Sequence, residues 1–199
     1  MSKRWIVHCI LAVGTVIPWM LQGEVVQVIV KWNAAICLNA CTPGLEKNLT
    51  AIKAVRDLQI NSRAGMAIMG WSPTTQFSYE PFNLATRMVG IRVSDIRVKV
   101  RGTIAHDAEN FYLVSLGDSS RFRLIGPILP NPDQYTIRQN PETHPLAPSL
   151  VTQLLNAEKN QELVTVEGPL FEPNRYTLIL ITEQTKFQKK DNVDPKLKI

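Results

Sequence analysis

The stretch IRVSDIRVKVRGTIAHD, residues 91–107, contains enough strand-forming residues for one long β-strand. Valine and isoleucine alternate with charged residues along it, as in a strand with one buried face. We interpret IRVSDIRVKV as the last strand of an N-terminal unit and DIRVKVRGTIAHD as the first strand of a β-barrel. Because no Gly- or Ser-rich linker separates the two, the sequence predicts two rigidly coupled units.

The N-terminal unit is predicted to have the order strand, helix, strand, strand, helix, strand. VVQVIVKW, residues 25–32, is a β-branched run and predicts the first strand. Thr42 as N-cap and Pro43 at the first helical position predict a helix, whose apolar face combines Leu45, Leu49 and Ile52.

A hairpin is predicted next, from Val55 to Asn61 and from Met66 to Trp71, with Met66 on its core side. A second helix is expected between an N-cap at Ser78 and a stop at Gly90, with Phe82, Leu84, Ala85 and Met88 on its buried side. This element order is that of a ferredoxin-like βαββαβ domain, expected over residues 24–97.

The second half is predicted to be a five-stranded barrel over residues 98–185. Two strands, NFYLVSLGD and SRFRLIGPIL, follow the long stretch, and a Pro-rich loop precedes the helix SLVTQLLNAEKN. ELVTVEGPLFE and RYTLILITEQT are then expected as one strand each. Three strands, a helix and two strands are the order of an OB-type Greek-key barrel, so the fold class is α+β.

The two ends of the chain differ from the rest. Residues 1–23 begin with Lys3 and Arg4 and continue as an apolar run, which predicts a signal peptide or an N-terminal membrane anchor. Either one implies a periplasmic or otherwise exported protein of a bacterial envelope. Residues 186–199 form a basic tail that is expected to be flexible, and the body between the two ends is neutral. A neutral body argues against nucleic acid as a partner.

Cys37 and Cys41 are the candidate site residues. They stand four apart in AAICLNACTPGL, just before the first predicted helix. A helix N-terminus lowers the pKa of a neighbouring thiol, and two thiolates suit Cu(I) or another soft ion. In an oxidising compartment the same pair can form a disulfide, and two unpaired buried thiols are the third possibility. The residues alone leave these three open.

The first unit resembles the heavy-metal-associated domain of copper chaperones and metal-pumping ATPases. Cys41 precedes LEKNLTAIKAV as the second cysteine of that family precedes its first helix, and AGMAIMGWSPTTQFSYEPFNLATRMVGIRV follows the family pattern. The spacing here is C-x-x-x-C instead of C-x-x-C, and AAI replaces the Gly-Met pair of the family. The resemblance implies metal ligation by Cys37 and Cys41, with Cu(I) passed to a metal-accepting partner protein.

The second half resembles bacterial OB-fold envelope proteins in its strand order and in VRGTI and VEGPL, without a site motif. Phe111, Tyr112 and Phe122 lie on the second and third predicted barrel strands, whose face OB-folds use for binding. Because neighbouring residues of a strand point to opposite sides, only one of Phe111 and Tyr112 can face outward. AHDAEN, residues 105–110, is interpreted as a polar turn and not as a metal loop.

Two functions remain, and neither is enzymatic, because the sequence contains no nucleophile, metalloprotease or phosphate-loop motif. The first is an exported soft-metal binding or transfer protein that uses Cys37 and Cys41. The second is an envelope interaction or assembly module, in which the cysteines form a disulfide or are incidental.

Overall fold

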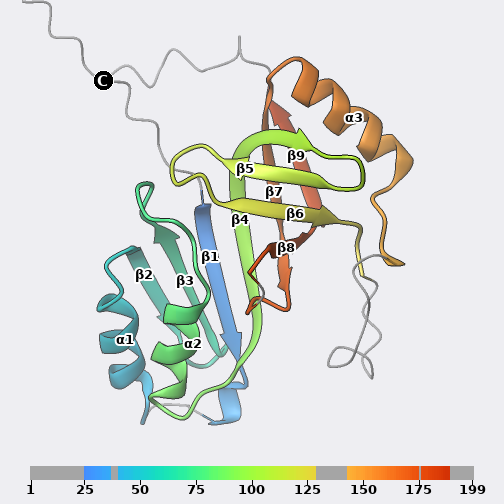
Figure 1. Cartoon of the computed structure of the whole chain (residues 1–199). Coiled ribbons are helices and arrows are strands. Elements are labelled where there is room, and N and C mark those ends of the chain that lie inside the picture. The colour runs from blue at the N-terminus through green and yellow to red at the C-terminus, as the bar shows by residue number, and fades with distance from the viewer. Residues whose placement is uncertain (1–24, 37–39, 129–142, 175, 189–199) are drawn as a thin grey trace, which may run out of the picture.

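Figure 1 shows the computed structural model, which describes residues 25–36, 40–128, 143–174 and 176–188. The predicted leader, Cys37 and most of the basic tail lie outside these residues. Within them, no helix is long and apolar enough to cross a membrane. The elements are β1 (Val25–Trp32), η1 (Ala34–Ile36), α1 (Thr42–Thr50), β2 (Val55–Asn61), β3 (Met66–Trp71), α2 (Glu80–Arg87), β4 (Val93–His106), β5 (Phe111–Ser115), β6 (Arg121–Ile125), α3 (Pro148–Lys159), β7 (Leu163–Phe171), β8 (Leu178–Ile181) and β9 (Gln184–Gln188).

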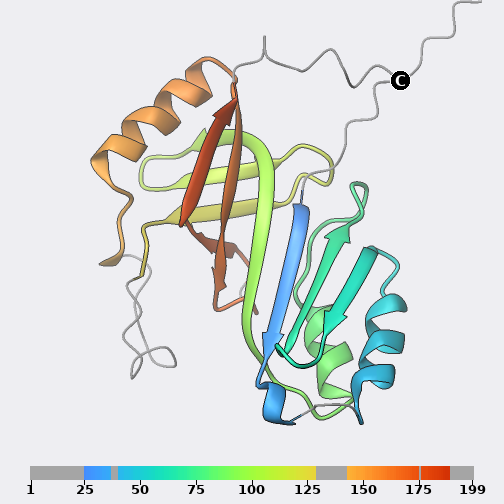
Figure 2. The ribbon, with the colours of Figure 1, turned by 180° about the vertical axis from the view of Figure 1, so that it is seen from behind.

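The N-terminal half is an antiparallel sheet in the order β2-β3-β1-β4. Helices α1 and α2 cover one face of it, and the other face is open (Figures 1 and 2). The bounds of β1, β2 and β3 are those that the sequence predicted. Alternation fixes the covered face, because the fully buried Val28 and Val30 on β1 point toward the helices that bury Leu45 and Leu49.

The ends of the two helices differ slightly from the prediction. Cys41, not Thr42, is the N-cap of α1, and Tyr79, not Ser78, is the N-cap of α2. Neither cap makes a side-chain hydrogen bond, and a proline in the first turn begins each helix instead. Gly90 follows the end of α2 at φ +77°, so the predicted glycine stop is confirmed.

The predicted buried faces were wrong at two places. On α2, Leu84 and Met88 are 59% and 68% exposed, whereas Phe82 is fully buried. On β3, Met69 is in the core and Met66 lies on the open face, half-buried. A two-residue period contains two faces, and only the position of the helices decides which one is buried.

Strand β4 belongs to both halves of the molecule. It has 14 residues and pairs with β1 from Val93 to Val100, with β7 from Arg97 to Gly102, and with β5 from Gly102 to His106. The expected boundary between residues 97 and 98 therefore falls inside one uninterrupted strand. The continuity predicted from residues 91–107 is confirmed.

The C-terminal half is a closed five-stranded barrel, β4-β5-β6-β8-β7 and back to β4. Only β6 and β8 are parallel, and α3 lies between β6 and β7 in the chain. This arrangement is compatible with an OB-type barrel. Two glycines permit the close strand approaches: a Cβ would stand 2.1 Å from the Val114 carbonyl oxygen at Gly102 and 1.8 Å from the Ile181 oxygen at Gly168.

The end of the barrel has one strand more than predicted. The run expected as a single strand is divided at Thr182 and Glu183 into β8 and β9. Strand β9 pairs with β7 and extends to Gln188, so it includes the first three residues of the segment expected to be a flexible tail. Strand β9 pairs with the edge of β7 from Leu163 to Glu167, which β8 leaves unpaired, and its Phe187 packs against the main core.

One apolar core runs through both halves. The rings of Trp71, Phe77 and Phe82 meet at centroid distances of 5.2–6.0 Å, and Phe77 lies 5.9 Å from Phe122 of the barrel. The Phe77 backbone N–H also donates to Asp118 Oδ2 at 2.9 Å and to Ser120 Oγ at 2.8 Å. The β5–β6 turn is thus bonded to the loop before α2.

On the open face, ion pairs continue the connection between the halves. Lys31 on β1 lies 3.5 Å from Asp95 on β4, Arg97 contacts both Asp95 and Glu183, and Lys99 lies 3.6 Å from Glu167 on β7. These side chains are partly exposed, so each pair contributes at most about 1 kcal/mol. The shared core is the stronger of the two connections.

Replacing Gly168 with alanine is expected to destabilise the fold by about 1–3 kcal/mol, because the new methyl group meets the Ile181 carbonyl where the barrel closes. Gly70→Ala is the matched control, since its Cβ would meet atoms no closer than 3.7 Å. Urea unfolding followed by circular dichroism measures both. Equal midpoints for the two variants would contradict this account of barrel closure.

Candidate functional site

Cys41 lies at the start of α1, where this helix meets the end of β1 and the β2–β3 turn. Gly65 in that turn accepts the Trp32 N–H at 2.8 Å and adopts φ +60°. A Cβ at Gly65 would lie 2.3 Å from the Trp32 carbonyl oxygen, so only glycine allows this contact. On the other side, the Thr42 and Ser62 hydroxyls are 2.7 Å apart. The start of α1 is therefore fixed against the sheet.

Cys41 is half-buried and packs against the main core. It is disulfide-bonded. The chain has three cysteines, and the other two, Cys9 and Cys37, lie outside the described residues, so the structure does not place the partner sulfur. A sulfur in a disulfide is not a thiolate, and the thiolate is the form that ligates soft metals.

The two histidines among the described residues, His106 and His144, lie in the C-terminal half. Strand β4 begins beside the end of β1, where Val93 pairs with Trp32, and ends at His106. At the usual rise per residue, its 14 residues separate the two ends by at most roughly 45 Å, and by less here because the strand bends where it enters the barrel (Figure 1). His144 lies beside the far end of β6, where its carbonyl accepts the Gly126 N–H. Within the described residues, no group of three or more His, Cys, Asp and Glu side chains is placed to hold a metal.

The outer face of β5 and β6 presents a fixed tyrosine. Phe122 is fully buried, Phe111 packs on the core, and Tyr112 faces outward, as the alternation predicted. The Arg121 guanidinium lies over the Tyr112 ring, 4.4 Å from its centroid. The Tyr112 hydroxyl donates to Asp107 Oδ2 at 3.0 Å. One side chain thus holds the ring face and another holds the hydroxyl.

Asp107 organises the loop between β4 and β5. Its Oδ1 accepts the backbone N–H of Glu109 at 3.0 Å and that of Asn110 at 2.8 Å. These two bonds and the Tyr112 hydroxyl hold the pKa of Asp107 below its ordinary value. Burial, and then the bond to Asp107, raises the pKa of Tyr112. The AHDAEN segment is a polar turn, as predicted.

Sequence reasoning missed Arg121 and Arg123. They flank Phe122 in RFR, so the alternation that buries Phe122 places both arginines on the outer face beside Tyr112. Neither guanidinium forms an ion pair with another described residue. Assigning Phe122 to the core would have been enough to predict that both neighbouring arginines face outward.

Comparisons of this chain with family models, with curated proteins and with solved structures find no match. The resemblances to heavy-metal-associated domains and to bacterial OB-fold proteins therefore stay predictions from the sequence.

The Asp107 carboxyl is expected to titrate below its ordinary pKa of 3.8, as measured by NMR of the side-chain carboxyl carbon. In Tyr112→Phe its pKa should rise but stay below that value, because the two backbone N–H groups remain. A pKa that is lower in the folded protein means that ionised Asp107 stabilises the fold above its unfolded pKa. This stabilisation is lost as pH falls through the folded pKa. An ordinary pKa for Asp107 in the unmodified protein would contradict the loop geometry.

Proposed function

We propose that this chain is an exported, non-enzymatic interaction or assembly protein, with Cys37 and Cys41 joined as a disulfide. The observation that carries the proposal is the disulfide-bonded state of Cys41 at the first turn of α1. Cys37 is the cysteine nearest to it in the chain, and disulfides persist in oxidising compartments. In this proposal the disulfide has a structural role and leaves no free thiolate at Cys37 or Cys41 for a metal ion.

The antiparallel order β2-β3-β1-β4, with two helices on one face, supports a ferredoxin-like first half. The barrel order, with its one parallel pair, supports an OB-type second half. In this proposal the first half supports the second mechanically. Strand β4 and the common core hold the two together, so a partner bound on the barrel meets a rigid surface.

The partner protein in this proposal binds at the outer face formed by Tyr112 and Arg121. Tyrosine and arginine are the residue types that most often contribute large shares of binding energy at interfaces. Asp107 and Arg121 hold the Tyr112 ring before any partner arrives, which lowers the entropy lost on binding. The expected partner carries carboxylates that can pair with Arg121.

Soft-metal binding is the second candidate. The observation in its favour is that Cys41 caps α1, so a reduced Cys41 would have its thiolate favoured by the helix N-terminus. Transfer would then require prior reduction of the bond. The two candidates differ in the oxidation state in which the protein works, and that state can be measured.

Tryptic mapping tests the disulfide, because no Lys or Arg lies between Lys31 and Lys47 and both cysteines fall in the peptide Trp32–Lys47. From unreduced protein this peptide should be lighter by two hydrogen atoms than after reduction. Cys9→Ser is the control and should leave that mass difference unchanged. A fully reduced peptide from protein exported to an oxidising compartment would contradict the proposal.

The metal alternative is tested by titrating reduced protein with Cu(I) against a chromophoric chelator. The interaction proposal predicts the same weak binding for the unmodified protein and for Cys41→Ser. Binding of one equivalent of Cu(I) that is lost in Cys41→Ser would favour the metal-transfer function instead.

Site-specific photo-crosslinking tests the partner face in cells that produce the full chain. A photoreactive amino acid in place of Tyr112 should give a discrete adduct with a second polypeptide. The same group in place of the exposed Lys47 on α1 is the control and should give none. Failure to crosslink at position 112, with the protein folded and exported, would contradict binding at this face.

A further inference from the structure

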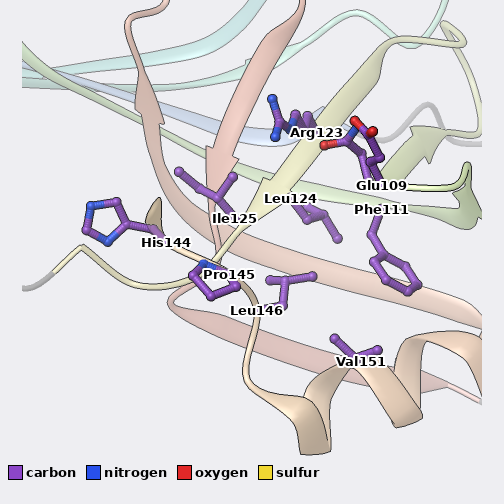
Figure 3. Close-up of a pocket in the computed structure, with 10 residues that line it drawn as sticks. Glu109, Phe111, Arg123, Leu124, Ile125, His144, Pro145, Leu146 and Val151 are labelled. Atoms are coloured by element: carbon purple, nitrogen blue, oxygen red, sulfur yellow. The ribbon is translucent and has the colours of Figure 1, made fainter. Parts of the chain in front are cut away.

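A cavity of about 310 Å³ lies at one end of the barrel (Figure 3). Its walls come from three parts of the chain that are distant in sequence: the start of β5, the end of β6, and residues 144–146 with the following helix α3. The cavity is separate from Cys41, which lies toward the opposite end of β4. Its volume is at the lower limit of small-molecule sites.

The lining of the cavity is divided between apolar and polar side chains. Phe111, Leu124, Leu146 and Val151 belong to its apolar part, and Figure 3 shows these side chains directed toward the space between β6 and α3. Leu124 is 4% exposed and belongs to the main core. An apolar group that enters here would displace water from surfaces that have no hydrogen bonds to offer it.

The walls are held in place without a ligand. The Phe111 ring stacks on His106, with centroids 5.7 Å apart and an interplanar angle of 21°. His106 in turn contacts the Glu158 carboxylate of α3 through its ring, and its backbone N–H donates to the same carboxylate at 3.2 Å. This chain of contacts fixes α3 to the start of β5, so the cavity is preformed.

The opposite wall lies unusually close to β6. The Gly126 N–H donates to the His144 carbonyl at 2.8 Å, and a Cβ at Gly126 would stand 2.2 Å from the Pro145 carbonyl oxygen. Only glycine therefore allows residues 144–146 to approach the end of β6. This approach brings Leu146 against the cavity.

The rim of the cavity carries one half-buried cation. Arg123 lines it, and within the described residues its guanidinium makes no ion pair or hydrogen bond. In the loop between β4 and β5, the Asp107 carboxylate is already occupied by two backbone N–H groups and by the Tyr112 hydroxyl. Glu109 also lines the rim, and its negative charge disfavours a ligand with two negative charges.

We propose that this cavity binds a small apolar monocarboxylate. The apolar body, of the size of one aromatic ring with a short chain, fills the space between Phe111, Leu124 and Leu146. The carboxylate pairs with the Arg123 guanidinium at the rim, where bidentate hydrogen bonds match the two oxygens. This site is separate from the cysteine pair, but its rim borders the Tyr112 face, because Arg123 is the cross-strand partner of Tyr112.

The test is an NMR titration of methyl-labelled full-length protein with 3-phenylpropionate as the probe. The methyl signals of Leu124, Leu146 and Val151 should shift together and saturate, while methyl groups of the N-terminal half, such as those of Leu45, stay in place. The absence of saturable shifts at the cavity methyls up to the solubility limit of the probe would overturn the proposal.

Two comparisons test the role of the charge. Arg123→Gln should weaken binding about tenfold or more, whereas Arg87→Gln, at an exposed arginine of α2 in the N-terminal half, should leave the affinity within about twofold. The uncharged analogue 3-phenylpropanol should bind the unmodified protein about tenfold more weakly than the acid, a result that depends on no variant. Equal affinity for the alcohol and the acid, or equal losses in the two arginine variants, would overturn the assignment of Arg123.

Discussion

The structure depends on one strand that serves two sheets. Strand β4 completes the N-terminal sheet through β1 and opens the barrel through β5 and β7. Gly102 lies where its pairing passes from β7 to β5, and a side chain there would collide with the Val114 carbonyl. Because both halves use the same backbone hydrogen-bonding groups of one strand, neither half can shift against the other without breaking a ladder.

Side-chain packing also holds the two halves together. Phe77 from the loop before α2 packs between the ring cluster of the first half and Phe122 of the barrel. Such contacts lie inside a single core and not at a surface between domains. The rigid body that results separates its chemical features in space: Cys41 lies toward one end of β4, while the Tyr112 face and the barrel-end cavity lie toward the other.

The sequence predicted the elements better than their faces. Strands β1, β2 and β3 followed from β-branched runs, turn residues and alternation at their correct bounds. The face of β3 did not, because Met66 and Met69 are equally apolar and only the sheet's contact with α1 and α2 selects Met69. The break between β8 and β9 at Thr182 was missed as well, since RYTLILITEQT contains no Gly, Pro, Asn, Asp or Ser to indicate a turn.

The candidate sites were predictable to different degrees. Cys41 was identified from its place before a helix. Whether it forms a disulfide depends on the distance between the two sulfurs in the fold and on the redox state of the compartment, and the spacing of the cysteines in the sequence determines neither. The RFR alternation at residues 121–123 contained the outward arginines once Phe122 was taken as core. The cavity was not predictable, because it forms only where residues 144–146 close against Gly126 and β5.

Scanning calorimetry of the full-length protein tests the central claim most directly. If one strand and one core couple the two halves, a single unfolding transition with equal calorimetric and van't Hoff enthalpies is expected. Phe122→Ala should move that whole transition to lower temperature. Two separable transitions, with only one of them displaced by Phe122→Ala, would show that the halves fold independently and would contradict the account.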